Sequence, residues 1–204
     1  MFNLNLTKRG FINKKSLLRR LGHIENRQKI AKSLNNLIDA VIELSEILIQ
    51  PKQVVNISRI RSITDRSVEI ENGFLIESTK VASLMAGCEQ IISFIVTIGP
   101  KLEQKRDHFI VQKETSQALL LDACGSEAAE ALAESLNISL IRDYSKKGFE
   151  LTKRYSPGYG DWCVSSQKDL LAFLNAGQIG VKLTETFIMS PEKSVSAVIG
   201  LKKI

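Results

Sequence analysis

The chain has 204 residues, of which 44% are apolar and 25% are charged. These proportions exclude disorder over most of the chain, and the length suits a single domain, residues 1–204, with one sizeable core. No apolar run approaches the roughly 20 residues of a membrane-spanning helix, and residues 1–9 lack the apolar centre of a secretory signal. We therefore expect a cytoplasmic protein with no membrane association.

Cysteine and histidine are too sparse to suggest a metal site. Cys88, Cys124 and Cys163 lie far apart in the sequence, and the chain contains only His23 and His108 as histidines. Neither histidine has a second ligand at short spacing, so we expect no metal held by the protein itself. With only two histidines in the chain, the sequence also gives little indication of catalysis of the Ser-His-Asp type.

Positive charge is concentrated at the start of the chain. The net charge is +6, and residues 1–32 carry nine Lys or Arg residues against Glu25 alone. Such a segment indicates an acidic partner or nucleic acid, although an exposed, solvated helix face explains it equally well. Few aromatic residues lie among these charges to stack on bases, so we expect no nucleic-acid partner.

The first 50 residues are predicted to form two helices. Asn13 can cap a short helix over residues 14–21, which Gly22 ends. A longer helix is expected from about Glu25 to Leu48, because Pro51 prevents its continuation. Apolar residues at spacings of three and four predict one buried stripe along it: Ile30, Leu34, Leu37, Ile38, Val41, Leu44 and Leu48.

Residues 54–76 alternate between apolar and polar side chains, which indicates strands. We expect strands around residues 55–57, 68–70 and 74–76, with Asn72-Gly73 as a hairpin turn between the last two. Residues 90–97 are apolar almost throughout, which favours a central strand covered on both faces.

Further helices are predicted around this central strand. Ser78 can cap a short helix over residues 80–85, and Gly99-Pro100 ends the central strand and begins another helix. The longest helix is expected over residues 114–146. Its small residues around Gly125 allow close approach to a neighbouring backbone, although a break in the helix at this glycine is also compatible with the pattern.

The last quarter of the chain is predicted to contain a strand, a helix and two strands, in that order: residues 149–152, 166–174, 181–187 and 194–201. Ser165 is the expected cap of the helix. Because helices and strands are intermixed without regular βαβ alternation, we predict an α+β fold with a twisted, largely antiparallel or mixed sheet flanked by helices. In this arrangement the N-terminal helices, residues 1–50, precede an α+β core at residues 51–204.

The loop at residues 154–162 (RYSPGYGDW) gathers the chemically most informative residues. Residues 156–159 fit a type II turn, in which proline sets the first central φ and Gly158 takes the positive φ of the second. Gly160 adds a further bend that would let main-chain amides approach a ligand. An arginine, a phenol, a carboxylate and the single tryptophan surround the turn: Arg154, Tyr159, Asp161 and Trp162. Ligand binding and simple coverage of a core edge are both compatible with this composition.

This loop, with residues 179–186 (IGVKLTET) and 191–196 (PEKSVS), resembles the activation (reactivation) domain of cobalamin-dependent methionine synthase. Residues 17–23 and 97–100 are weaker matches, so the resemblance extends over nearly the whole chain. It is greatest to members of the family that consist of this domain alone. The resemblance implies the α+β fold of that domain.

The family binds S-adenosylmethionine through an arginine followed, after three residues, by Gly-Tyr. Arg154 and Gly158-Tyr159 match this signature. The resemblance implies that Arg154 holds the methionyl carboxylate, for which a guanidinium fork is well suited. Further ligand contacts are expected from Ser156, Pro157, Gly158 and Tyr159. Additional candidates near the site are Gly160, Asp161, Trp162 and Glu185, of which we expect the two carboxylates to stabilise a turn or the surface and the tryptophan to pack over the core edge.

In this family, the domain reactivates a corrinoid whose cobalt has been oxidised from Co(I) to inactive Co(II). An electron donor, typically a flavodoxin, reduces the cobalt, and S-adenosylmethionine supplies the methyl group. The resemblance therefore implies reductive reactivation of a corrinoid (cobalamin) protein, with no catalytic acid or base in this chain. The corrinoid would be supplied by a partner, either a corrinoid-binding protein or a methionine synthase that lacks its own activation domain.

An alternative function is also compatible with the sequence. In the full-length enzymes of the family an aspartate near the start of the domain contacts S-adenosylmethionine, whereas residues 1–38 of this chain contain no aspartate. The protein could therefore be an interaction module that grips a corrinoid protein without an S-adenosylmethionine-dependent activity of its own. Its basic segment, residues 1–32, could steer an acidic flavodoxin or carrier towards it.

Overall fold

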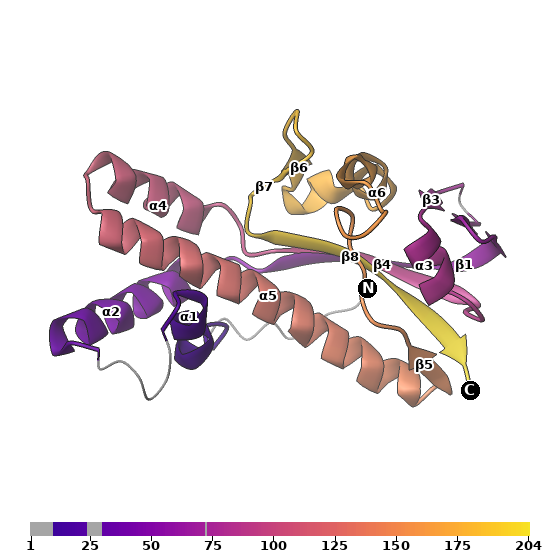
Figure 1. Ribbon diagram of the computed structural model, residues 1–204, viewed down its shortest axis with the longest axis horizontal. Coiled ribbons are helices and arrows are strands. Elements are labelled where there is room, and N and C mark those ends of the chain that lie inside the picture. Colours follow the sequence, from indigo (N-terminus) through magenta and orange to yellow (C-terminus); the bar gives the residue numbers. More distant parts are fainter. Residues whose placement is uncertain (1–9, 24–29, 72) are drawn as a thin grey trace.

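The computed structural model describes residues 10–23, 30–71 and 73–204. In this part of the chain, six strands form one sheet in the order β3-β2-β1-β4-β8-β5, and every pairing is antiparallel (Figure 1). The strands are β1 Lys52–Ile63, β2 Ser67–Ile70, β3 Leu75–Glu77, β4 Gln90–Thr97, β5 Phe149–Leu151 and β8 Ser194–Lys203. The prediction of an α+β fold with a largely antiparallel sheet is confirmed.

Helices cover both faces of this sheet. They are α1 Lys14–Arg20, α2 Lys32–Leu48, α3 Thr79–Leu84, α4 Lys101–Val111, α5 Thr115–Ser145 and α6 Gln167–Phe173. Figure 1 shows α5 running along the molecule on one side of the sheet, with α3 and α6 on the opposite side. Two short 3-10 turns, Val164–Ser166 and Ala176–Ile179, flank α6, and a small hairpin of β6 (Lys182–Leu183) and β7 (Met189–Ser190) follows.

The central strand β4 divides the core into two layers. Ile92 and Phe94 pack with α1, α2, α4 and α5, whereas Ile91 and Ile95 pack with α3, α6 and Trp162. This division follows from the alternation of side chains along a strand, and it requires apolar residues at nearly every position. The predicted central strand at residues 90–97, covered on both faces, is therefore confirmed.

The predicted long helix is observed as α5, and it is continuous through Gly125. A Cβ atom built at Gly125 would lie 2.8 Å from Leu102 Cδ2 of α4 and 3.1 Å from Lys193 Cγ, just before β8. The glycine therefore allows α4 and the entry to β8 to approach the helix closely. The atoms that come close to Gly125 belong to the side chains of Leu102 and Lys193, whereas the sequence suggested a neighbouring backbone.

The N-terminal helices match the prediction in part. The Asn13 side chain caps α1 by accepting a hydrogen bond from the Ser16 N–H at 3.0 Å, as expected. The second helix begins at Lys32, so its predicted start near Glu25 is wrong: residues 24–29 lie outside the described chain, but Ile30 and Ala31 are described and are not helical. Leu34, near this end, is 45% exposed and does not belong to the buried stripe.

The predicted strand at residues 181–187 is largely wrong. Only Lys182–Leu183 is extended, and it pairs with Met189–Ser190 in a hairpin outside the main sheet. The chain turns back because the Thr184 hydroxyl accepts the Ile188 N–H at 3.1 Å and Phe187 adopts a φ of 63°.

Two smaller predictions have different outcomes. Ser165 does not cap α6: its hydroxyl donates to the Cys163 sulfur at 3.0 Å, and α6 begins at Gln167 after a 3-10 turn. The predicted Asn72-Gly73 turn includes Asn72, which lies outside the described residues, but the flanking strands β2 and β3 do pair antiparallel. None of the helices within the described ranges combines the length and apolar character needed to cross a membrane.

The close packing at Gly125 predicts that Gly125→Val destabilises the protein. The added side chain would overlap Leu102 and Lys193, and overpacking of this kind typically costs about 1–3 kcal/mol, which exceeds the small gain in helix propensity. Urea denaturation should show the loss. Gly177→Ala is the matched control, because no described atom lies within 4 Å of the Cβ it would add; equal stabilities for the two variants would contradict this account.

Candidate functional site

The site begins where the edge of β8 is left without a neighbouring strand. β5 pairs only with the end of β8, at Leu201–Lys203. The chain leaving β5 then follows the same edge, and Tyr155 exchanges main-chain hydrogen bonds of 3.0 and 2.8 Å with Val198. Beyond this bridge the chain turns away, so that the edge at residues 194–196 faces a cavity.

The turn at residues 156–159 has the predicted shape. Gly158 has a φ of 92°, and the Tyr159 N–H donates to the Ser156 carbonyl at 3.3 Å, as a type II turn requires. The Gly158 N–H also donates to the Trp162 carbonyl at 2.7 Å, which folds the loop upon itself. The backbone of the loop is thus fixed by its own hydrogen bonds.

Position 160 has no room for a side chain, because the Tyr155 ring of the same loop lies against it. The φ of Gly160 is 55°, and a Cβ atom there would lie 2.3 Å from the Tyr155 hydroxyl oxygen. Tyr155 stacks on Trp162, with ring centroids 6.4 Å apart and planes at 15°. Trp162 is completely buried in the layer beneath the loop and does not line the cavity.

Asp161 anchors the loop to the first turn of α3. Its carboxylate accepts hydrogen bonds from the Ser78 hydroxyl at 2.6 Å, the Thr79 N–H at 2.7 Å and the Lys80 N–H at 3.3 Å. The Thr79 hydroxyl donates to it as well. These hydrogen bonds, that of Ser78 foremost, hold the pKa of the Asp161 carboxyl well below its usual range. Both carboxylate oxygens are therefore engaged by the protein.

The loop, β8 and α5 together enclose a cavity of about 320 Å³. Its lining comes from Glu130, Arg154, Tyr155, Ser156, Pro157, Tyr159, Gln167, Met189, Ser194, Val195 and Ser196. Four predicted site residues are among them, and Tyr159 is still 68% exposed at the open side. The other predicted residues lie outside this lining: Gly158, Gly160, Asp161, Trp162 and Glu185. Glu185 is exposed in the turn between β6 and β7.

Arg154 supplies the principal charge of the cavity. Its Nη2 donates to Glu130 Oε2 at 2.6 Å, across 24 residues of sequence. Its Nη1 is enclosed and hydrogen-bonds to none of the described residues. A guanidinium nitrogen in this state normally has an acceptor, because an enclosed donor without a partner is costly. Part of the Arg154 side chain, 27%, remains exposed, so a ligand in the cavity would meet the arginine through atoms other than Nη1.

Glu130 and Gln167 are cavity residues that the sequence did not reveal. Glu130 is a charged residue within the run of small residues along α5. This contrast is the sequence feature that could have indicated a functional role for it. Gln167 opens α6, and its Oε1 accepts a hydrogen bond from the Ser196 hydroxyl at 2.8 Å. No local pattern could have indicated Gln167, because the register of β8 against α6 places it there.

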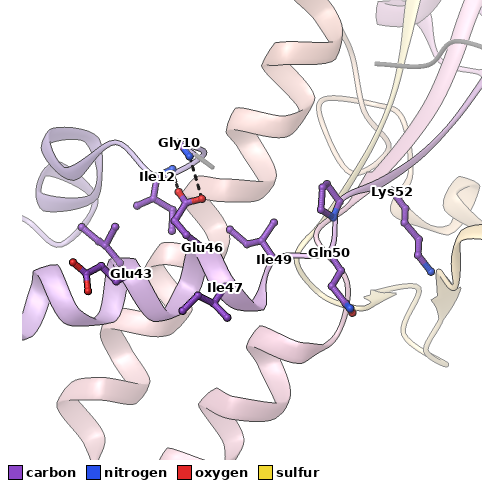
Figure 2. A pocket seen from close by; sticks show the side chains of 10 residues that line it. Gly10, Ile12, Glu43, Glu46, Ile47, Ile49, Gln50 and Lys52 are labelled. Carbon is purple, nitrogen blue, oxygen red and sulfur yellow. Dashed lines mark hydrogen bonds between the residues drawn. The ribbon is translucent and has the colours of Figure 1, made fainter. Parts of the chain in front are cut away.

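A larger cavity, of about 1040 Å³, lies between the end of α2 and the start of β1 (Figure 2). Its walls include Ile42, Ile47 and Ile49. Figure 2 shows the Glu46 carboxylate directed at the backbone, where it accepts the Gly10 and Ile12 N–H groups at 3.1 Å each. This carboxylate accepts hydrogen bonds from the backbone, whereas the smaller cavity is lined by a guanidinium and a carboxylate together, Arg154 and Glu130.

Metal ligands are not gathered in the part of the chain that the structure describes. Within it, no three His, Cys, Asp or Glu side chains are arranged to hold an ion. His23 and His108 line neither of the two cavities described above.

Comparison with known proteins identifies the family. The family model described as the activation domain of vitamin B12-dependent methionine synthase matches residues 11–203 of this chain. The chain belongs to this family. Among solved structures, a MetH reactivation domain bound to AdoHcy is similar to this activation domain, with a TM-score of 0.72. The match covers 95% of this chain and 75% of the other at 18% identity, which establishes a shared fold.

The lowered pKa of Asp161 predicts a pH-dependent effect of Asp161→Asn. A carboxyl whose pKa is depressed by folding stabilises the protein above the unfolded pKa of about 3.9, and this contribution disappears as the pH falls towards the folded pKa. The difference in unfolding free energy between wild type and variant should therefore be full above about pH 5 and shrink below about pH 4. Chemical denaturation at several pH values measures it.

Asp65→Asn provides the control for this experiment, because Asp65 is exposed and makes no hydrogen bond with the other described residues. It should leave stability nearly unchanged across the pH range. A difference between wild type and Asp161→Asn that is the same at pH 3 and pH 7 would contradict the proposed anchoring by charge.

Proposed function

We propose that this activation-domain protein binds S-adenosylmethionine in the cavity beside β8. Bound there, the ligand would present its methyl group to the reduced cobalt of a corrinoid carried by a partner protein. The main support is the Arg154–Glu130 pair, a guanidinium and a carboxylate that are joined at 2.6 Å and line the cavity together. The family match and the AdoHcy bound to the similar MetH domain point in the same direction.

The pair is complementary to the α-amino acid end of S-adenosylmethionine. The exposed part of the Arg154 side chain can donate to the ligand carboxylate, and Glu130, whose side chain is half exposed, can accept from its ammonium group. Both side chains are positioned before the ligand arrives, so less ordering opposes binding. The cavity volume of about 320 Å³ is at the lower end of the ~300–1,000 Å³ typical of small-ligand sites.

The chemistry of methyl transfer explains why the cavity needs no acid or base. The carbon–sulfur bond breaks with its electron pair moving to sulfur, and the two electrons of Co(I) form the new bond to carbon. The sulfonium leaves as a neutral thioether, and no proton moves. The task of the protein is therefore to orient the methyl group, an effect of proximity. No histidine or cysteine is among the described residues that line the cavity.

The partners in this proposal supply the remaining components. A corrinoid-binding protein, or a methionine synthase without its own activation domain, would bring the cobalamin. A flavodoxin-like donor would supply the single electron that returns Co(II) to Co(I). We propose that the chain acts in the cytoplasm as a single domain, residues 1–204, as the resemblance to stand-alone members of the family implies.

Arg154→Ala is predicted to weaken S-adenosylmethionine binding by about 10- to 150-fold. The charge-assisted contact with the carboxylate is worth roughly 1.5–3 kcal/mol, and its loss should appear directly in the dissociation constant. Isothermal titration calorimetry measures this constant. Arg61→Ala is the matched control, because Arg61 forms an ion pair of 3.0 Å with Glu69 outside the cavity.

Two results would contradict the proposal. One is an affinity for S-adenosylmethionine that Arg154→Ala leaves unchanged. The other is the absence of binding by wild type, both with and without a corrinoid protein. If wild type captured a corrinoid protein yet transferred no methyl group to it from S-adenosylmethionine, the alternative of an interaction module would be favoured.

A further inference from the structure

Gln167 is a cavity residue with hydrogen-bonding capacity that the protein does not use. The side chain is only 8% exposed, and its Oε1 accepts the Ser196 hydroxyl at 2.8 Å. Among the described residues, no acceptor bonds to its Nε2 group. Because the oxygen is held by Ser196, the two N–H donors are the part of the carboxamide left to face the cavity that Gln167 lines. Gln167 Nε2 is not among the enclosed side-chain atoms that lack a partner, so it is open to the cavity and available to a ligand.

The neighbouring edge of β8 offers a main-chain acceptor and donor. Val198 uses its N–H and C=O to bond Tyr155 at this edge, and the Gly200 carbonyl accepts the Thr152 N–H at 3.0 Å. In an antiparallel sheet, alternate residues of a strand face the same neighbour. Ser196 therefore turns its N–H and C=O outwards as well, and there it lines the cavity without a main-chain hydrogen bond to another described residue.

Together these groups are complementary to an amino-substituted heterocycle. The Gln167 donors suit a ring nitrogen, and the Ser196 carbonyl suits an exocyclic amino group beside it. Pro157, Met189 and Val195 add apolar surface to the same cavity, which suits the faces of a flat ring better than a hydroxylated sugar.

We infer that Gln167 is a specificity-determining residue, which recognises the adenine ring of S-adenosylmethionine by donating a hydrogen bond to a ring nitrogen. Ser196 fixes the orientation of the carboxamide through its hydroxyl and accepts the adenine amino group at its carbonyl. This inference rests on the proposed function, since it assigns the nucleoside end of the same ligand. The Arg154–Glu130 pair then binds the amino-acid end of the same ligand.

The test compares S-adenosylhomocysteine with its 1-deaza, 3-deaza and 7-deaza analogues, each of which replaces one ring nitrogen by a CH group. Calorimetry on wild type should show that one of the three binds about fivefold more weakly, the usual loss for one neutral hydrogen bond. Gln167→Met keeps the length of the side chain but removes the donors. It should bind S-adenosylhomocysteine about fivefold more weakly than wild type and show no further loss with that analogue.

Gln178→Met is the matched control, because Gln178 donates to the Leu174 carbonyl and does not line the cavity. Its affinities should equal those of wild type, and thermal melting should show that both variants are folded. The deaza series on wild type is informative even if Gln167→Met fails to fold.

The inference is overturned if Gln167→Met binds S-adenosylhomocysteine as tightly as wild type does. It is also overturned if no deaza analogue is weakened on wild type, or if removal of a ribose hydroxyl is the change whose effect disappears in Gln167→Met. Failure of the proposed function looks different: wild type would then bind neither S-adenosylmethionine nor S-adenosylhomocysteine.

Discussion

The hydrogen bonds between the Asp161 carboxylate and the first turn of α3 set the geometry of the site. They join two segments more than eighty residues apart and pin the loop at residues 154–162 over the second layer of the core. Carboxylates are favoured at helix N-termini, where main-chain N–H groups lack partners within the helix. With Asp161 held there, Trp162 is buried, Tyr155 stacks on it, and Tyr155 bridges to Val198. The edge of β8 before that bridge is left free to bind a ligand.

The opposite wall of the cavity is held by charge as well as by packing. Lys193, the residue before β8, bonds through Nζ to Asp122 of α5 at 2.8 Å, and its N–H donates to Glu103 of α4 at 2.8 Å. Arg106 joins the same Asp122 at 2.9 Å. This network fixes the start of β8, and hence the Ser194–Ser196 edge, against the helix that carries Glu130. The ligand groups thus come from rigid elements, which favours preorganised binding.

The sequence predicted the features that depend on local chemistry. The Asn13 and Ser78 caps, the central strand at residues 90–97 and the Pro157-Gly158 turn each follow from a few adjacent residues, and the structure contains all of them. The sequence could not predict that Glu130 meets Arg154 or that Gln167 meets Ser196, since both contacts depend on how α5 and α6 pack on the sheet. The start of α2 and the strand at residues 181–187 were misplaced because apolar periodicity does not reveal the local backbone conformation: Ala31 is not helical, with a ψ of 143°, and Phe187 adopts a positive φ.

A crystal structure of the protein with S-adenosylhomocysteine tests the central claim most directly. The account predicts electron density for the ligand in the cavity beside β8, with its carboxylate on Arg154 and its ammonium group near Glu130. The adenine ring should lie against Gln167 and Ser196. Density in the larger cavity beside α2, or an empty cavity beside β8 at saturating ligand, would contradict the account.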